Sequence, residues 1–590
     1  MTVDTRASAR GFLRRMPRPF NILVAVVCTG VAALIAYPIG HTLFSVFFES
    51  GLPTLRPLRL VLRDAHNREA IKNTLIIAGS STVLATVQAV VLAWINERTD
   101  AHLPAIGRVL PMLPLLVSPI AAAVAWVFLL SPGAGLLNGW LRDLGIGAGS
   151  SRGPLNILTM PGMIAMYSIY LVPFTFIPIN NALVNIDPAL EEASRNSGAG
   201  LLKTLRKVTL PAIKPAIYSG AILTAVIALA LFSVPVILGP PAGVQVVSVR
   251  VYNMLTKEYP SQTSEAVALS VLMFVIVMIG LFVRSRVLRR GNFSVMSGRA
   301  RSETRVSLGR WRWPARALVL GYIAATAIIP FLALLVVSLQ PFWSAKLHLS
   351  KSTFVHYRET FFDNVNTQSA LKNSILLALV GATITVLVLV LLGLFVHRNK
   401  RARGYIVDGV VKFPAAFPQL IMAIALLLAF GPKPFHLSGT LYLLLIGYFV
   451  VYVPYGSFIV GSGFTQLGTE FSEASSSCGA SPGRTFRRIE LPLVMPSVVS
   501  GWTLLFVFIL SDVTVSSLLT TKNAPVVGFA IVDQYENGSY PTIAALGVVV
   551  SMTCALVVFG AQGLSYLRSS RRGTGESRAV LANQSTVMGR

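Results

Sequence analysis

Long apolar stretches, separated by short polar segments, dominate this sequence. A helix of about 20 apolar residues spans the roughly 30 Å hydrocarbon core of a bilayer. Twelve stretches of this chain reach that length. They lie near residues 21–46, 71–95, 104–130, 159–183, 216–238, 264–284, 315–338, 371–396, 407–430, 438–461, 496–519 and 542–566. The pattern predicts an all-α polytopic membrane protein with about 12 transmembrane helices.

Composition narrows the class of protein further. Of the 590 residues, 54% are hydrophobic and only 12% are charged, so one water-soluble core could not bury the apolar side chains. The net charge of +27 could suit a nucleic acid. However, the Lys and Arg residues lie mostly between the apolar runs and form no basic stripe interleaved with aromatic residues. We therefore expect a lipid bilayer, and no nucleic acid, as the partner of this chain.

One segment occurs twice in the chain. Residues 192–211 read EASRNSGAGLLKTLRKVTLP, and residues 473–492 read EASSSCGASPGRTFRRIELP. Both place Glu-Ala-Ser, Gly, an aliphatic residue and Leu-Pro at the same spacing. Further matches join Ile71–Thr74 with Leu371–Ser374, and Val246–Asn253 with Val526–Asp533. The chain is therefore predicted to be an internal duplication, and six spans in each half make the two repeats parallel.

The duplication divides the chain into five parts. They are a tail at 1–20, a first half at 21–284 with its repeated loop at 190–215, a basic linker at 285–313, a second half at 314–567 with its loop at 471–496, and a tail at 568–590. A cytoplasmic N-terminus puts about 35 of the Lys and Arg residues in inside segments, as the positive-inside rule requires. Both termini and both loops are then cytoplasmic, at the plasma (inner) membrane. The first apolar run continues too far for a cleaved signal peptide, so we interpret it as a retained span.

Each repeated segment has the properties of a short helix at the membrane surface. Its Glu suits the positive end of a helix dipole, and Gly198 and Gly479 permit a sharp turn or the close approach of a partner. The Leu-Pro pair is expected to end the segment where the next span begins. Basic residues follow each Gly, at Lys203, Arg206, Lys207, Arg484, Arg487 and Arg488. We interpret these as anchors for lipid head groups rather than as specific contacts.

The repeated segments resemble the EAA loop of binding-protein-dependent ABC importer permeases. In that family the loop forms a coupling helix, which sits in a groove of a cytoplasmic ATPase and moves when the ATPase dimer closes on ATP. Carried over, the two coupling loops comprise Glu192, Ala193, Gly198, Leu210, Pro211, Glu473, Ala474, Gly479, Leu491 and Pro492. Both copies depart from strict EAA, with Ser194 and Ser475 at the third place. The resemblance implies a permease subunit that works with two copies of a cytoplasmic ABC ATPase and an extracytoplasmic solute-binding protein.

The sequence shows no catalytic motif of its own. It has no GxxxxGK[ST] loop to hold phosphates, so we expect a transport subunit that is not an enzyme and needs no cofactor, with ATP used by the partner ATPase. It has no HExxH motif and no His/Cys cluster, and His348 and His356 are the nearest pair. Cys28, Cys478 and Cys554 lie far apart. We therefore expect no catalytic residue, no metal site and no disulfide framework.

Polar residues inside apolar runs are candidates for a solute pathway, because a charge near the bilayer centre persists only where it faces protein or water. Asp512 is the clearest case. It lies in the run FVFILSDVTVSSLL with Ser511, Thr514, Ser516 and Ser517. Its alternative role is a structural hydrogen bond that locks two helices together. The residues alone do not choose between these two interpretations.

The corresponding stretch of the first half, LALFSVPVILGPP, contains Ser233 but no acid, so the predicted pathway is asymmetric. Pro235, Pro240 and Pro241 are expected to break or end the helix there, which is tolerated where the freed carbonyls line a cavity. The candidate pathway residues are therefore Ser233, Pro235, Ser511, Asp512 and Thr514.

The chain resembles the fused permeases of ferric-iron importers in four features: two complete halves in one chain, GLLN at Gly135–Asn138, PLNI at Pro154–Ile157 and the VPVILGPP stretch. This resemblance implies ferric iron as the solute, passed by alternating access as the two halves rock. A ferric-iron permease would have an acid in the stretch Ala230–Ser233, where this chain has none. Permeases for thiamine, aminoethylphosphonate and polyamines share much of the pattern and stay as alternatives.

A secondary transporter of the major facilitator type is the alternative from another class. It also has twelve spans, parallel halves and a long basic central loop. It should carry a Gly- and Arg-rich motif between spans two and three, where this chain has NERTDAHLPAIGR from Asn96. The repeated motif of this chain lies between spans four and five instead, which favours the ABC permease. A membrane enzyme is the third class, and no catalytic constellation supports it.

Overall fold

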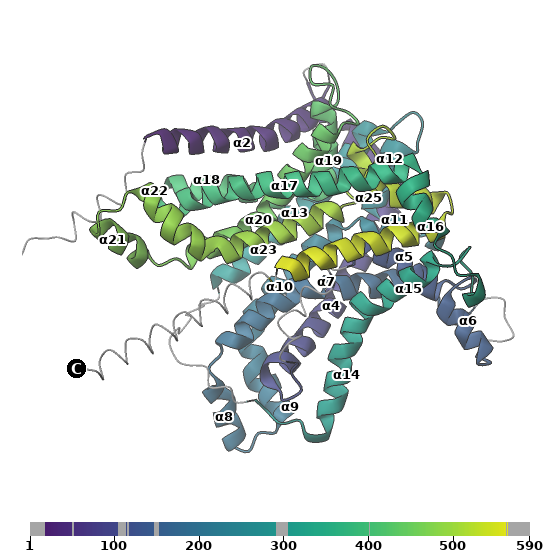
Figure 1. Ribbon diagram of the computed structural model, residues 1–590, viewed down its shortest axis with the longest axis horizontal. Helices are drawn as coiled ribbons and strands as arrows, with labels where there is room; N and C mark the ends of the chain where they lie inside the picture. The colour runs from purple at the N-terminus through teal and green to yellow at the C-terminus, as the bar shows by residue number, and fades with distance from the viewer. Residues whose placement is uncertain are drawn as a thin grey trace, which may run out of the picture.

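The computed structural model describes residues 18–49, 52–103, 117–146, 153–290, 305–399 and 402–561, together with Pro114 and Gly563 (Figure 1). The regular structure in these residues is helical, apart from a small hairpin of β1 (Phe48–Glu49) and β2 (Leu52–Pro53) and one isolated bridge. The predicted all-α class is therefore confirmed. Most of the tail at 1–20, all of the tail at 568–590 and residues 291–304 of the linker lie outside the described residues.

Ten helices in the described part of the chain are long and apolar enough to cross a membrane. In order they are α2 (Arg18–Phe47), α4 (Ala65–Arg98), α7 (Met160–Asn185), α10 (Leu210–Ala230) with α9 (Leu201–Thr204) and η2 (Leu205–Thr209) before it, α13 (Thr263–Arg290), α14 (Arg312–Ile323) continued by η4 (Ala324–Ile328) and α15 (Ile329–Ser338), α17 (Val365–Arg398), α20 (Leu441–Thr465), α23 (Leu491–Leu510) with α22 (Pro482–Thr485) and η8 (Phe486–Glu490) before it, and a last helix at Tyr540–Ala561. Each of the ten overlaps a predicted span.

Shorter helices connect these spans. They are α3 (Arg56–Arg63), α6 (Leu136–Asp143), α8 (Pro188–Asn196), η3 (Gly309–Trp311), η5 (Leu349–Lys351), α16 (Val355–Arg358), η6 (Glu359–Asp363) and α21 (Thr469–Ser477).

The third predicted span of the second half is broken rather than straight. The prediction of one helix at 407–430 was wrong, because α18 (Ala402–Lys412) and η7 (Phe413–Ala416) meet α19 (Gln419–Phe430) at a bend of 100°. Pro414 and Pro418 lie at this bend and deny the helix its backbone donors there. In the first half, the predicted span at 104–130 is described mainly as α5 (Pro119–Leu130), and residues 104–113 lie outside the described part.

The fifth span of each half ends earlier than its apolar pattern predicts. The helix expected at 216–238 stops at Ala230, and the helix expected at 496–519 stops at Leu510. A pair of short helices follows each span: α11 (Ser233–Ala242) with α12 (Val247–Thr256), and α24 (Ser516–Leu519) with α25 (Val527–Glu536). The first pair is bent by 85°. The predicted stretches are apolar, but the helix is interrupted within each of them.

The break in the first half precedes the prolines that were expected to cause it. Pro235 lies in the first turn of α11, where a missing N–H leaves no helical bond unmade. Pro240 and Pro241 lie in the last turn, and Gly243 ends the helix in the left-handed region with φ +66°. The prediction for Pro235 was therefore wrong, while Pro240 and Pro241 do stand where the helix ends.

Hydrogen bonds repeat between the two halves and confirm the duplication. Asn73 Nδ2 donates to the carbonyl of Gln245 at 3.0 Å, and Asn373 Nδ2 donates to the carbonyl of Pro525 at 2.9 Å. The next residue along each helix, Thr74 or Ser374, accepts from the backbone N–H of Val247 or Val527 at 2.9 and 2.8 Å. The second span of each half therefore holds the pair of short helices in the same way.

The first span of each half packs against the other half. Helix α2 packs mainly on α19, and also on α17, α18 and α20, all of the second half. Helix α15 packs on α5 of the first half, and Tyr322 Oη donates to the carbonyl of Ile169 at 3.3 Å. Figure 1 shows α2 lying along α17 and α18. This exchange joins the two halves into one bundle.

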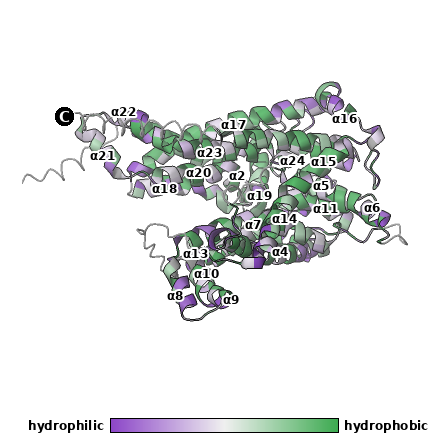
Figure 2. Ribbon diagram, turned by 60° about the horizontal axis from the view of Figure 1, so that its bottom comes forward, coloured by the Kyte–Doolittle hydropathy of each residue, from purple (hydrophilic) through white to green (hydrophobic). Residues whose placement is uncertain are grey.

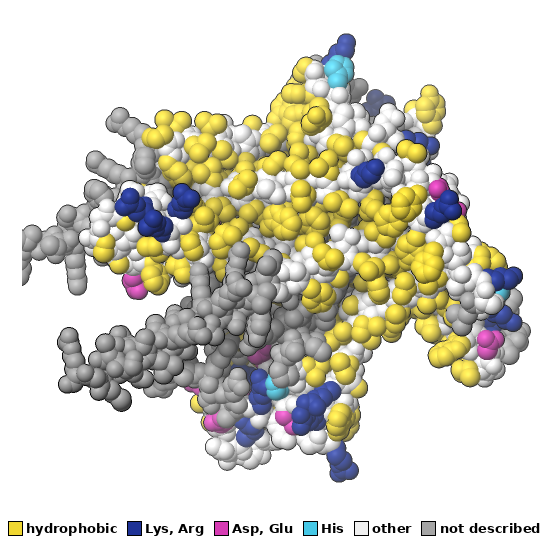
Figure 3. Space-filling model, viewed as in Figure 1, with side chains coloured by type: hydrophobic (Ala, Val, Ile, Leu, Met, Phe, Trp, Pro, Cys, Tyr) yellow, Lys and Arg dark blue, Asp and Glu magenta, His cyan; other side chains and the backbone are white. Residues whose placement is uncertain are grey.

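The surface has the polarity of a membrane protein. Hydrophobic residues cover the middle of the helices, and hydrophilic residues concentrate at ends such as α8, α9, α16 and α22 (Figure 2). Apolar side chains form a broad band across the visible face, while Lys and Arg lie mostly at its edges (Figure 3). Long exposed apolar helices with charged ends are suited to a bilayer and its two interfaces.

The Thr74 contact generates a prediction. Thr74→Val should lower the free energy of unfolding by about 1–3 kcal/mol, because the buried N–H of Val247 loses its acceptor while the shape of the side chain is kept. The matched control is Thr86→Val, since Thr86 Oγ1 donates only to Thr82 in its own helix. Thermal unfolding of the purified variants in detergent measures both. Equal losses in the two variants would contradict the anchoring role of Thr74.

Candidate functional site

The two repeated loops have the same structure. In each loop a short helix, α8 or α21, is followed by a turn and then by the long helix of the fifth span. Figure 2 places α8 and α9 at the same end of the molecule as α21 and α22, with α6 and α16 at the opposite end. The short helix predicted from the sequence is confirmed in both copies.

The two glycines end the short helices. Gly198 and Gly479 have φ of +83° and +75°, in the left-handed region that favours glycine. The backbone N–H groups of Ala199 and Ala480 donate to the carbonyls of Ser194 and Ser475, each at 3.1 Å. These bonds close the same helix-capping motif in each loop. The sharp turn predicted at each Gly is therefore confirmed.

The serines that depart from the EAA pattern have a specific contact. The hydroxyls of Ser194 and Thr204 are 3.0 Å apart, and those of Ser475 and Thr485 are 2.9 Å apart. Each pair joins the short helix to the first turn of the following helix. This contact was not predicted from the sequence, although both copies carry its signal, a Thr ten residues after the motif Ser.

The Leu-Pro pairs do not end a segment, and that prediction was wrong. Pro211 and Pro492 lie inside continuous helices, Leu201–Ala230 and Pro482–Leu510. Each Pro follows a five-residue π-helical turn, η2 or η8. The i→i+5 hydrogen bonds of this turn allow the helix to continue past a residue that has no backbone N–H. Leu210 and Leu491 directly follow these turns. The part of each loop that follows the glycine turn is therefore continuous with the fifth span.

The outer face of each loop presents apolar side chains. Leu190 is 55% exposed and Phe471, at the equivalent place two residues before the motif Glu, is 54% exposed. Ala193 and Ala474 are exposed, as is Glu473, whereas Glu192 is half-buried. Each loop therefore has a large exposed apolar side chain at the same place. The motif residues were predicted from the sequence, but Leu190 and Phe471 were not.

Asp512 lies in the break after α23 and caps the next turn. Its Oδ2 accepts from Tyr452 Oη at 2.6 Å, and its Oδ1 accepts from the backbone N–H groups of Val515 and Ser516, both at 3.0 Å. The side chain is buried. Three donors thus satisfy a carboxylate that would otherwise be costly to bury. The contact joins α20 to α24, as the structural interpretation of Asp512 requires.

The first half treats the same break differently. Counted from the end of the fifth span, Phe232 corresponds to Asp512, and it is fully buried with its ring centroid 5.4 Å from that of Tyr252. The freed carbonyl of Leu231 accepts from Ser248 Oγ at 3.0 Å and from Tyr167 Oη at 3.3 Å. An aromatic side chain and two hydroxyls here replace the carboxylate cap.

The five candidate pathway residues fall into two groups. Ser511, Asp512 and Thr514 lie together in the break of the second half, and Ser233 and Pro235 are buried at the start of α11 in the first half. The carbonyl of Ser511 accepts from Ser118 Oγ of the first half at 3.4 Å, so this break lies where the halves meet. In the described part of the chain, no hydrogen bond joins Asp512 to Ser233.

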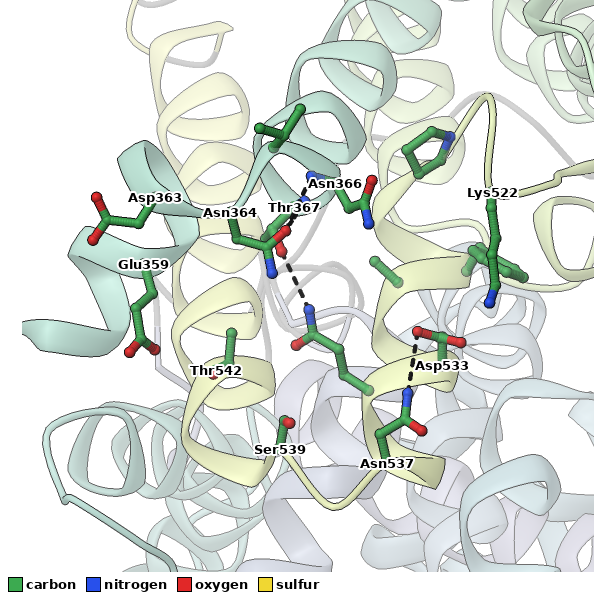
Figure 4. Close-up of a pocket in the computed structure, with 15 residues that line it drawn as sticks. Glu359, Asp363, Asn364, Asn366, Thr367, Lys522, Asp533, Asn537, Ser539 and Thr542 are labelled. Carbon is green, nitrogen blue, oxygen red and sulfur yellow. Dashed lines mark hydrogen bonds between the residues drawn. The ribbon is translucent and has the colours of Figure 1, made fainter.

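A cavity of about 680 Å³ opens at the opposite end of the molecule from the loops. Glu359 and Asp363 lie on one side of it and Asp533 and Lys522 on the other, while Gln534 Nε2 donates to Thr367 Oγ1 at 3.3 Å (Figure 4). Asp363 also pairs with Arg358, and Glu359 with His356. Among the described residues, no group of three or more His, Cys, Asp or Glu side chains could hold a metal ion.

The first half has an arginine where this cavity lies. By the match of Val246–Asn253 with Val526–Asp533, Arg250 corresponds to Ala530, which lines the cavity. The Arg250 guanidinium donates to Asn67 Oδ1 at 3.0 Å and forms ion pairs with Asp64 and Glu258. The cavity therefore lies where a long side chain in one half is replaced by a methyl group in the other. The aligned segments already contain this difference, Arg250 against Ala530, but the cavity was not predicted from it.

The geometry of Asp512 predicts how its variants behave. Asp512→Asn should lower the free energy of unfolding by only about 1 kcal/mol, because the amide oxygen still accepts from the two N–H groups, whereas Asp512→Ala should cost about 3 kcal/mol or more. Thermal unfolding in detergent measures both, with Ser517→Ala as a control that removes only a bond within its own turn. If the Asp512→Asn protein keeps its stability but loses solute uptake, the result would instead support a role for the Asp512 charge in the solute pathway.

Comparison with known proteins gives one family and several relatives. The family described as binding-protein-dependent transport system inner membrane component matches twice, over residues 81–290 and 389–570. A probable ABC transporter permease protein, y4fN of Sinorhizobium fredii, is 26% identical over 91% of this chain and 94% of its own length. The ferric transport system permease protein FbpB of Actinobacillus pleuropneumoniae is 22% identical over 89% of this chain and 75% of its own. The spermidine/putrescine transport system permease protein PotC of Haemophilus influenzae is 28% identical over 34% of this chain and 79% of its own.

The family match covers both halves and includes both repeated loops, which agrees with the hydrogen bonds that repeat between the halves. It sets aside the major facilitator and the membrane enzyme as alternatives. The chain belongs to the binding-protein-dependent transport system inner membrane components, the permeases of ABC importers, and is a multi-pass inner-membrane protein with two permease halves fused in one chain.

Proposed function

We propose that this chain forms the solute pathway of an ATP-driven importer and that α8 and α21 are the coupling helices that dock on two copies of a cytoplasmic ABC ATPase. The observation that carries the proposal is the equal construction of the two loops, each with an exposed apolar side chain, Leu190 or Phe471, beside the motif residues. The sequence contains no phosphate-binding loop. ATP is therefore bound and hydrolysed by the partner, and this chain needs no cofactor.

The connection of each short helix to its fifth span supports alternating access. The hydroxyl pairs Ser194–Thr204 and Ser475–Thr485 join α8 and α21 to the first turns of the unbroken helices Leu201–Ala230 and Pro482–Leu510, so a displacement of either short helix is carried into the membrane. An extracytoplasmic binding protein delivers the solute to the end opposite the loops. With the loops inside, both termini are cytoplasmic, as the distribution of Lys and Arg favours.

Ferric iron is the solute that the relatives support best, because a ferric transport permease matches most of this chain. The cavity at the opposite end is lined by three carboxylates and one ammonium group, which favours a cationic group over an anion. A polyamine is the second candidate, since PotC is a spermidine/putrescine permease and polyamines are also cations. Thiamine and aminoethylphosphonate remain further candidates, with support from the sequence pattern alone.

The coupling proposal predicts the behaviour of a double variant. Glu192→Ala with Glu473→Ala should insert normally but weaken ATPase association by about tenfold or more, because two docking contacts of about 1 kcal/mol each together exceed the 1.4 kcal/mol that equals tenfold. Co-purification of the ATPase with the tagged chain measures this. The control is Glu69→Ala with Glu536→Ala, which removes two exposed acids distant from the loops. Normal co-purification and normal transport by the double variant would contradict the coupling assignment.

The solute assignment predicts the outcome of an uptake experiment. Cells with and without this chain are given radiolabelled ferric iron, with excess spermidine, thiamine or aminoethylphosphonate as competitor. We expect iron uptake to fall in cells that lack the chain. None of the three competitors should reduce iron uptake in cells that have it. Unchanged iron uptake without the chain would exclude iron, and labelled spermidine would then be the next solute to measure.

A further inference from the structure

A buried ion pair ties the first coupling helix to two spans. Arg98 is the last residue of α4 and is 7% exposed. Its guanidinium donates to the carbonyls of Leu183 and Ile186 at the end of α7, at 2.8 and 3.2 Å, and lies 3.5 Å from Glu191 Oε1 of α8. Glu191 is 5% exposed and accepts from Thr209 Oγ1 at 2.7 Å. Thr209 ends η2, at the base of the fifth span.

A second buried ion pair does the same in the other half. Arg398 is the last residue of α17, and its guanidinium lies 2.6 Å from Glu490 Oε2. Glu490 is 1% exposed and ends η8, at the base of the fifth span. Its Oε1 accepts from Ser472 Oγ of the coupling helix α21 at 2.8 Å. An arginine, an acid and a hydroxyl again join the second span, the coupling helix and the fifth span.

The acid and the hydroxyl have exchanged places between the halves. Arg98 and Arg398 are equivalent, since each ends a 34-residue helix that carries Asn73 or Asn373 at the same position. Glu191 and Ser472 each directly precede the motif Glu, and Thr209 and Glu490 each directly precede the Leu-Pro pair. The acid is therefore on the coupling helix in the first half and on the fifth span in the second, while the hydroxyl takes the other position.

The exchange shows what the cluster requires. A buried carboxylate and a buried guanidinium persist only where each has its partner. The carboxylate accepts a further hydrogen bond from a hydroxyl, which adds no charge; the hydroxyl donates to Oε1, the oxygen that faces the arginine, in the first half, and to the other oxygen in the second half. One acid and one hydroxyl opposite the arginine meet both needs in either order, whereas two acids or two hydroxyls do not.

We propose that Arg98, Glu191 and Thr209, and likewise Arg398, Glu490 and Ser472, are positioning residues that lock each coupling helix to the second and fifth spans of its half. This inference rests on the proposed coupling function. The ATPase contacts the exposed face of the loop, and the buried cluster behind it makes the loop and the two spans move together. Loss of the cluster separates ATP hydrolysis from transport without removing the docking face.

Transposing the two side chains tests the proposal. Glu191→Ser leaves Arg98 without an acid and should lower the solute transported per ATP by about tenfold or more, while the ATPase still co-purifies. Thr209→Glu alone places two acids beside one arginine and should also lower the solute transported per ATP. The double variant E191S/T209E gives the first half the order of the second and should recover most of the wild-type ratio. Proteoliposomes that hold the permease, the ATPase and the binding protein measure transport and ATP hydrolysis together.

The outcomes separate the inference from the function on which it rests. A wild-type chain that recruits no ATPase would overturn the proposed function. A wild-type chain that couples, with Glu191→Ser coupling equally well, would overturn only the positioning role, as would a double variant no better than the single ones. The reciprocal variant S472E/E490S repeats the test in the second half. Failure of both transposed variants to fold also counts against the proposal, because it asserts that the two orders are interchangeable.

Discussion

Backbone hydrogen bonding inside the bilayer is the constraint on which this structure depends, because each amide and carbonyl there must find its partner in the protein. Both fifth spans stop early and leave groups unbonded. The carbonyl of Leu231 accepts from Tyr167 and Ser248 in one half, and Asp512 accepts from two backbone N–H groups in the other. With these partners in place, irregular backbone can lie between the spans, and in the second half it lies where the halves meet.

The duplication conserves the places of contacts more than the residues that make them. Phe232 stands where the other half has Asp512, and Ala530 where it has Arg250. In the two repeated loops an acid and a hydroxyl have exchanged positions around an arginine that stays in place. Buried polar groups must be satisfied jointly, so their partners change together. Where one partner is absent and nothing takes its space, as at Ala530, a cavity lies.

The two halves differ in detail but pack together as one helical bundle. Each first span packs on the opposite half, so the halves cannot move apart without repacking α2 and α15. At one end, the two loops present apolar side chains above their buried ion pairs. At the other end, the acid-lined cavity of the second half lies where Arg250 and its ion pairs stand in the first. The described parts of the two halves are therefore alike at the loops and different at the opposite end.

The sequence alone determined the features that depend on local composition and on repetition. Apolar length located ten spans, because a helix that satisfies its own backbone can be recognised from its residues. The duplication, both short loop helices and the turns at Gly198 and Gly479 followed from one repeated segment. Only the tertiary structure decided where the helix ends within an apolar run, as at Ala230 and Leu510, because the composition of the run is the same whether the helix continues or breaks. The tertiary structure also decided the partners of Asp512, Arg98 and Glu490. A buried charge is paired with side chains distant in the sequence, and the periodicity of apolar residues does not predict such pairs.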